Sequence, residues 1–312
     1  MENDSLFNQH EFVYANEYVH GVNTGYYQRN NTDLISGKAE RKYNEYINKV
    51  ISSKPYAYDK HSFKKYDDTE VISKSLQIII FIFGNNKKIL KEFEDFGKLI
   101  QLNNSDEVLS GCCEMSLNAK TGEALSVLAV DLPNLDNTSS VIGLVHEFMH
   151  YHIGINHLNY NKKYYYQEIL PIFGEKIASF YMDNDDKDLT RKIENIRLDC
   201  ISYHYGDEKN DYANLAKMMK NDKNGIFKNI ISKTDFDNLG KYLNALSEAY
   251  GIGYLYAEAL FQSYIRYPES RDKINNFLYG KCSLDDLLTD LRINAKNNQS
   301  YEYVDDRIRK LK

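Results

Sequence analysis

The sequence is poor in several residue types whose absence narrows the possible folds. Its 312 residues include no tryptophan, 4 prolines and 4 cysteines. So few prolines leave long stretches free to form helices. Cys112 and Cys113 are adjacent, whereas Cys200 and Cys282 are isolated, so neither a disulfide framework nor a CxxC metal site is expected. Free thiols are typical of a reducing compartment, and we expect a cytoplasmic protein.

The chain also lacks an excess of positive charge and a long apolar run. Its formal net charge is −6, and no basic patch dominates, which argues against nucleic acid as a partner. The longest apolar run, residues 76–83, is too short to span a bilayer, and the first twelve residues are too polar for a signal peptide. We therefore expect no membrane partner. The oligomeric state is left open.

One five-residue string carries most of the functional information. Residues 146–150 read HEFMH, which is an HExxH motif. On a helix, His146 and His150 lie on one face, where two imidazoles can bind one Zn²⁺ ion. Glu147 then lies beside the metal, in the position of a general base for a zinc-bound water. The motif predicts a zinc site with catalytic potential.

The surrounding sequence supplies the helix that the motif needs. Residues 127–130 are typical of a buried strand, and a polar loop follows. Asn137 or Thr138 is a suitable N-cap. Apolar residues from Val141 to Phe148 then recur at the helical spacing. The HExxH string is therefore expected on a capped, buried helix.

A catalytic zinc usually has a third protein ligand, for which three candidates follow His150. His157 gives a near miss to the HExxHxxGxxH pattern, one residue too late. Glu168 lies 18 residues after His150, close to the thermolysin-like spacing, and Glu175 lies 25 residues after it. Pro171 suits a first helical turn, which puts Glu175 on rigid backbone inside that helix. We predict Glu175 as the ligand, with Glu168 accepting the second N–H of a ligand histidine.

These spacings resemble the M3 family of zinc oligopeptidases, which includes the thimet oligopeptidase and oligoendopeptidase F types. Residues 111–118 and 124–132 look like the β-hairpin of that family before the zinc helix. Residues 249–258, AYGIGYLYAE, look like its Gly/Tyr-rich segment facing the metal. The resemblance covers about residues 105–270. This chain would be a short version, without the family's histidine just before the tyrosine segment, since no histidine follows His204.

The resemblance implies a zinc metalloendopeptidase that hydrolyses internal bonds of short, unstructured peptides. Glu147 would take the proton of the attacking water and pass it to the leaving amine. Tyr254, or as a second choice Tyr250, would donate to the oxyanion. His204 is less favoured as a substitute for the missing histidine than as a surface or core residue. The strand at 124–132 could pair with an extended peptide by β-augmentation.

Two other readings of the motif remain. One is a thermolysin- or aminopeptidase-like enzyme in which Glu168 is the third zinc ligand. The other is a regulatory protein that keeps the metal and binds peptides without cleaving them.

The chain as a whole is predicted to be mainly α, a zincin-like helical fold with one small β-hairpin or sheet before the zinc helix. A polar stretch at 103–106 suggests an N-terminal helical region, 1–105, and a zinc-binding catalytic domain, 106–312, packed as one unit. Helices are expected at 36–52, 69–83, 86–103, 138–153, 164–182, 187–205, 211–220, 235–266, 269–279, 284–295 and 300–311, and the hairpin at about 110–132 with its turn at 118–122.

Overall fold

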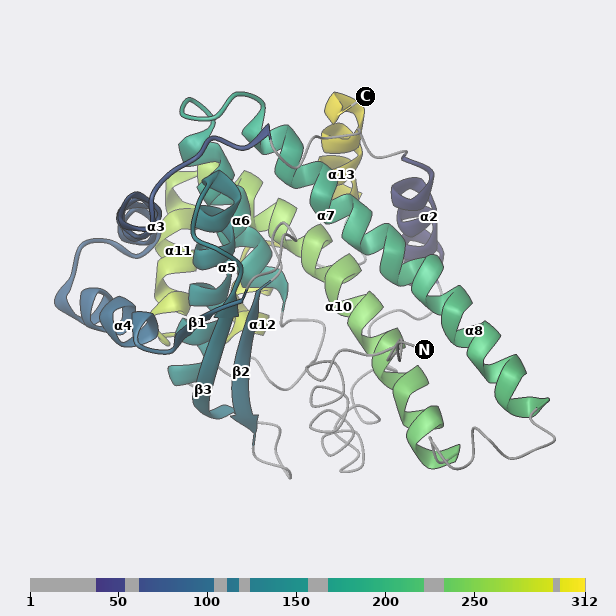
Figure 1. Ribbon diagram of the computed structural model, residues 1–312. Coiled ribbons are helices and arrows are strands. Elements are labelled where there is room, and N and C mark those ends of the chain that lie inside the picture. Colours follow the sequence, from purple (N-terminus) through teal and green to yellow (C-terminus); the bar gives the residue numbers. More distant parts are fainter. Residues whose placement is uncertain are drawn as a thin grey trace.

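The computed structural model describes residues 38–53, 62–103, 111–117, 124–156, 168–221, 233–293 and 298–311. Within these ranges the protein is mainly helical, as predicted (Figure 1). The helices are α2 (Lys38–Ser52), α3 (Asp68–Phe83), α4 (Lys87–Gly97), α5 (Thr138–Ile155), α6 (Ile169–Met182), α7 (Leu189–Tyr205), α8 (Asp207–Lys220), α10 (Lys233–Arg266), α11 (Pro268–Leu278), α12 (Leu284–Asp290) and α13 (Asn298–Leu311).

A small sheet precedes the helix that carries HExxH. It consists of β1 (Ile100–Leu102), β2 (Cys112–Leu117) and β3 (Ala124–Leu132), in the order β1-β3-β2. Strands β2 and β3 are antiparallel, which confirms the predicted hairpin, although its turn lies outside the described residues. Strand β2 lies at one edge of the sheet and β3 at its centre.

The helix predicted at 86–103 was wrong in its last part. Helix α4 ends at Gly97, and the chain then forms β1, which pairs parallel to β3. The Val130 N–H donates to the Leu99 carbonyl at 3.0 Å, and the Asn103 N–H donates to the Leu132 carbonyl at 2.8 Å. The open edge of β3 therefore captures a segment whose local sequence is compatible with a helix.

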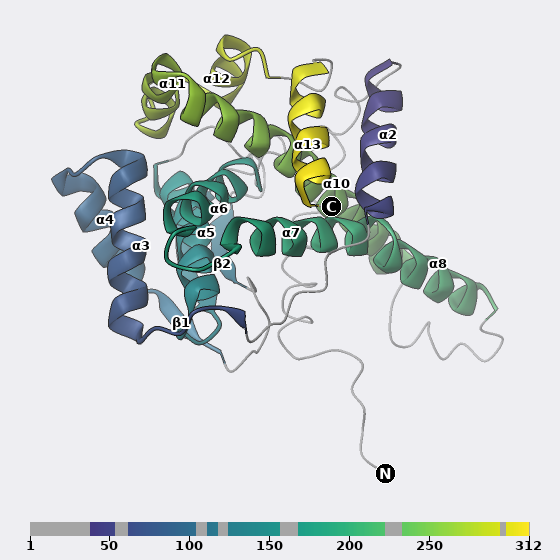
Figure 2. The same ribbon diagram turned by 90° about the horizontal axis from the view of Figure 1, so that it is seen from above.

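Helix α5 is the buried centre of the molecule, since the sheet and α6 pack directly on it. Helices α3 and α4 cover one side of α5, and α7 packs against α6 on the other (Figure 2). Phe148 of α5 meets Phe83 and Phe96 with ring centroids 5.9 and 5.5 Å apart. Burial of each aromatic side chain stabilises the fold by about 1.5–3 kcal/mol, so the face of α5 that carries Phe148 is packed stably against α3 and α4.

Behind α6 lies a buried ionic network that connects four helices. Lys176 of α6 lies 2.7 Å from Glu194 of α7 and 2.9 Å from Glu258 of α10. Arg307 of α13 lies 3.3 Å from Glu258. Two cations thus balance two carboxylates, all four largely removed from water. Removing one member would leave a buried charge unpaired, which is strongly destabilising.

Three further expectations concern the whole chain. Cys200 and Cys282 are free thiols, as predicted. No helix in the described part of the chain is both long and apolar enough to cross a membrane. The boundary near residue 105 falls on residues outside the described ranges and stays a prediction. Helices on both sides of it, such as α3 and α5, pack together.

Candidate metal centre

The HExxH residues lie on a helix with a well-formed start. Asn137 is the N-cap of α5, and its side-chain oxygen accepts from the backbone N–H groups of Ser139 and Ser140 at 2.7 and 3.4 Å. This cap is one of the two that the sequence predicted. His146 and Glu147 are buried, while His150 is partly exposed. The helix thus presents its two histidines together on one face.

The two histidines and Glu168 surround a common point. His146 Nε2 and His150 Nε2 are 3.2 Å apart. Two ligands with bonds of about 2.0–2.1 Å to a tetrahedral zinc lie roughly 3.3 Å apart. Each Nε2 atom is also 3.7 Å from an oxygen of Glu168, which immediately precedes α6. Among the described residues, His146, Glu147 and His150 each offer one ligand atom within 4.8 Å of the others, so they form a group that could hold a metal ion.

Glu175 lies on the opposite side of the His146 ring. Its Oε1 atom is 2.7 Å from His146 Nδ1, not from Nε2. Arg197 of α7 binds the same carboxylate with two nitrogens: its Nε donates to Glu175 Oε2 at 3.1 Å, and its Nη2 donates to Oε1. A carboxylate that accepts Nδ1–H leaves the Nε2 lone pair of His146 available to a metal.

The two glutamates lie beside different nitrogens of the histidines. Glu168 lies 3.7 Å from the Nε2 atoms of His146 and His150, whereas Glu175 lies 2.7 Å from His146 Nδ1. The physical reason is that the two residues are seven positions apart, about two turns of helix, and so point to the same side of α6 at different heights. Which of the two carboxylates binds the metal stays a prediction. His157 lies outside the described residues.

The side chain of Glu147 is buried and lies against Gly111, just before the start of β2. It is 3% exposed, and its Oε2 atom has no hydrogen-bond partner among the described residues. A Cβ atom added at Gly111 would lie only 2.5 Å from Glu147 Oε1. Burial raises the pKa of Glu147 to about 7. A carboxylate tuned to neutrality suits a general base.

Tyr254, the first choice for an oxyanion donor, does not lie in this site. Its side chain is fully buried, and its hydroxyl donates to Glu194 Oε2 in the ionic network behind α6. The Lys176 ammonium also lies 4.1 Å from the centre of its ring. Tyr254 is therefore a core residue.

Tyr250, the second choice, lies one helical turn away on the face of α10 that meets Glu168. Gly253 marks that face, because a Cβ added there would be 2.7 Å from Glu168 Cβ. The ring of Tyr250 stacks on His204 with centroids 4.9 Å apart and planes 4° apart. The Arg197 guanidinium lies 5.5 Å from the same ring. Tyr250 and His204, which was judged a surface or core residue, are thus both near the metal centre.

Two contributors had no sequence signal strong enough to find them. Arg197 belongs to a charged helix in which nothing distinguishes it from its neighbours. Gly111 precedes a strand and could serve an ordinary turn. Only their contacts with Glu175 and Glu147 show their importance.

The site gathers three buried carboxyl groups, whose ionisation depends on what lies beside each of them. Burial opposes ionisation of Glu175, but the charges of Arg197 and His146 outweigh it and lower its pKa to about 2. Burial raises the pKa of Glu168, whose Oε2 atom is buried without a hydrogen-bond partner among the described residues. Burial also lowers the pKa of His150. Three buried carboxyl groups therefore lie beside one guanidinium, and a bound cation would favour the ionised form of those whose pKa burial raises.

Comparison with known proteins supports the fold. No family model matches the chain, and no curated protein matches it. Among solved structures, it resembles the crystal structure of a protein from Bacillus anthracis str. Ames with a provisional assignment as an oligoendopeptidase F, with a TM-score of 0.52 and 13% sequence identity. The similarity covers 95% of this chain and 56% of that chain. The chain thus spans little more than half of that structure, and at this identity the likeness shows a distantly related fold.

Proposed function

We propose that this protein is a zinc metallopeptidase that cleaves internal bonds of short, unstructured peptides. The observation that carries the proposal is the buried meeting of His146 Nε2, His150 Nε2 and the Glu168 carboxylate beside Glu147. The oligoendopeptidase-like fold supports the same class. A cytoplasmic location is part of this proposal and rests on the free thiols.

In the proposed site, His146, His150 and Glu168 hold the zinc, and Glu175 with Arg197 fixes the ring of His146. Zinc bound there supplies a Lewis acid that polarises a peptide carbonyl and lowers the pKa of water toward neutrality. With Glu168 as third ligand, the protein would combine an oligopeptidase-like fold with a ligand 18 residues after His150, which is close to the thermolysin-like spacing. Loss of a carboxylate that orients a ligand histidine, as Glu175 is proposed to do, typically lowers the affinity for the metal by about 10–100-fold.

Glu147 is the proposed proton carrier. Its buried Oε2 has no other partner among the described residues, so it can accept the proton of the attacking water. With a pKa of about 7, Glu147 can then release that proton to the leaving amine. Tyr250 is the proposed donor to the developing oxyanion, held in place by His204 and Arg197.

The edge of β2 is proposed as a second place for the peptide, beside the strand at 124–132 that the sequence predicted. Strand β1 pairs with β3 only from Val130 to Leu132, so the earlier part of β3 is not paired with β1. Strand β2 lies at the edge of the sheet. It begins at Cys112, directly after Gly111, and Gly111 lies against the side chain of Glu147. An extended peptide added to this edge would be held by its main chain, which favours broad sequence specificity.

The ligand assignment is tested by measuring zinc content and affinity in Glu168→Gln and Glu175→Gln. We expect Glu168→Gln to lose stoichiometric zinc and Glu175→Gln to retain it with about 10–100-fold lower affinity. The reverse pattern would return Glu175 to the ligand position. Equal retention in both variants would refute the proposed centre.

Activity is tested with a library of quenched peptides of varied sequence. Cleavage that requires zinc and is lost in Glu147→Gln, with zinc still bound, supports a glutamate-assisted metallopeptidase. Absence of cleavage with stoichiometric zinc would instead favour a protein that binds peptides without processing them.

A further inference from the structure

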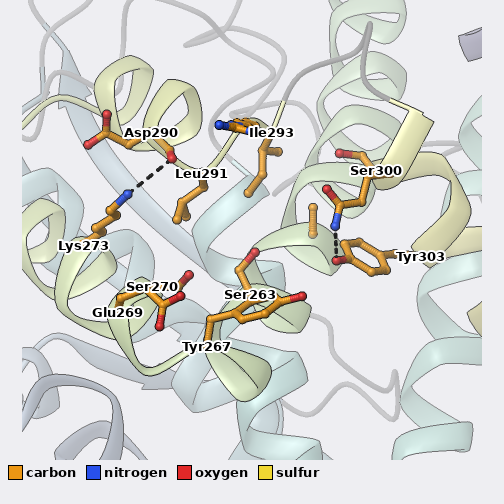
Figure 3. A pocket seen from close by; sticks show the side chains of 13 residues that line it. Ser263, Tyr267, Glu269, Ser270, Lys273, Asp290, Leu291, Ile293, Ser300 and Tyr303 are labelled. Carbon is orange, nitrogen blue, oxygen red and sulfur yellow. Dashed lines mark hydrogen bonds between the residues drawn. The ribbon is translucent and has the colours of Figure 1, made fainter.

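A second cavity lies at the C-terminal end of the molecule, lined by none of the residues of the metal centre. It is enclosed by α10, α11, the end of α12 and α13, and its volume is about 340 Å³ (Figure 3). This volume is within the range of small-molecule sites, which begins at about 300 Å³. Its lining combines a polar floor, charged side chains and the apolar side chains of Leu291 and Ile293.

The floor of the cavity presents hydroxyl groups that the protein does not satisfy. Ser263, Ser270 and Ser300 are 9%, 5% and 1% exposed. They come from three different helices and line the cavity together (Figure 3). None of the three hydroxyls forms a hydrogen bond with another described residue, unlike the buried Ser75 hydroxyl, which donates to the Val71 carbonyl at 2.8 Å. These three hydroxyls can therefore bind water or a guest in the cavity.

The wall formed by α11 presents charges of both signs. Glu269 and Lys273 are four residues apart on this helix, a spacing at which such residues commonly pair. Here no ion pair within 4.0 Å joins them in the described part of the chain. The Lys273 ammonium instead reaches the Asp290 carbonyl oxygen at 3.4 Å. Asp290 and Arg292 also line the cavity, so groups of both signs border it, and Glu269 and Lys273 do so without pairing with each other.

We propose that this cavity binds a small zwitterion of the amino-acid or dipeptide class. The ammonium of the guest pairs with Glu269, and its carboxylate pairs with Lys273 and accepts hydrogen bonds from the serine hydroxyls. Its side chain packs on Leu291 and Ile293. This charge pattern distinguishes such a guest from a neutral sugar or a simple anion, and the inference does not depend on hydrolysis at the metal centre.

The test is calorimetric titration of the full chain carrying Glu147→Gln, which removes the proposed proton carrier. The probes are alanyl-leucine, the same dipeptide blocked as its N-acetyl amide, and the disaccharide trehalose. We expect alanyl-leucine to bind and both other probes to bind at least about tenfold more weakly, because neither carries the two charges that pair with Glu269 and Lys273. Equal binding of the blocked dipeptide, or no binding of alanyl-leucine, would overturn the proposal.

Variants locate the bound probe. Glu269→Gln and Lys273→Met should each weaken alanyl-leucine about tenfold or more, and both lie at the rim, where folding is little affected. Lys91→Met, on the remote surface of α4, is the matched control and should change nothing. Glu168→Gln should also leave binding unchanged. Loss of binding in Glu168→Gln but not in Lys273→Met would place the dipeptide at the metal centre and refute the second site.

Discussion

Replacing Gly111 by alanine should remove catalysis while leaving the metal in place. The added Cβ would lie 2.5 Å from Glu147 Oε1, 2.9 Å from its Cγ and 3.0 Å from its Cδ. Non-bonded carbon contacts are comfortable at about 3.5 Å, so the carboxylate must withdraw by roughly 1 Å or β2 must shift. Either movement changes where Glu147 meets the attacking water.

A misplacement of about 1 Å in a reacting group can lower a rate by about 10²-fold. We therefore expect kcat/KM for a cleaved peptide to fall about 10²-fold in Gly111→Ala. Zinc content should stay stoichiometric, because the three atoms nearest to the added Cβ all belong to Glu147. Peptide cleavage and elemental analysis of the same preparation give both quantities.

Gly143→Ala is the matched control on the helix that carries HExxH. A Cβ at Gly143 meets nothing within 4 Å, and alanine in a helix is favoured over glycine by about 1 kcal/mol. This variant should keep its activity. The reasoning about Gly111 is refuted if Gly111→Ala retains activity within about threefold of the parent, or if it loses its zinc.

Three further predictions concern other parts of the structure. Tyr250→Phe should lower kcat by about 10²-fold with little change in the free energy of unfolding, whereas Tyr254→Phe should mainly lower that free energy by about 1–3 kcal/mol. Peptide cleavage assays measure the first effect and urea unfolding measures the second. The opposite pattern would return Tyr254 to the site as the oxyanion donor. Lys176→Met should lower the free energy of unfolding by about 3–5 kcal/mol, because its two buried carboxylate partners lose their shared cation; a change below about 1 kcal/mol would contradict this. Burial opposes ionisation of Glu92, but its hydrogen bond from His152 at 2.6 Å lowers its pKa below the ordinary value. This stabilisation is therefore complete above the ordinary glutamate pKa and is lost as the pH falls through the lowered one, so unfolding curves from about pH 7 to about pH 3 should show a smaller acid loss in Glu92→Gln.

Local signals in the sequence were sufficient for most of the helices. The cap at Asn137 and the apolar spacing after it lie within one segment, and α5 begins where they indicate. Strand β1 was missed because its structure depends on a partner about thirty residues later along the chain. The segment that forms β1 follows a helix directly, and nothing local distinguishes it from another turn of that helix.

The candidate site was predictable in its residue types more than in their arrangement. HExxH fixes His146, Glu147 and His150 because helical geometry relates them directly. The order of Glu168 and Glu175 depends on how α6 is set against α5, which no local pattern determines. The choice between Tyr250 and Tyr254, one turn apart on α10, depends on how far that helix is shifted along its axis relative to α6, and with 27 tyrosines in the chain the residue type alone does not decide it.

The compactness of the metal centre along the chain has a consequence for protein design. The proposed ligands, the proton carrier and the orienting carboxylate all come from residues 146–175, on α5 or beside and within α6. A packed pair of helices with these residues at the same heights is therefore a natural unit to graft onto an artificial scaffold. Arg197 and Tyr250 come from other helices and would be absent from such a graft. The graft would therefore show how well the metal binds without the side chains that α7 and α10 contribute.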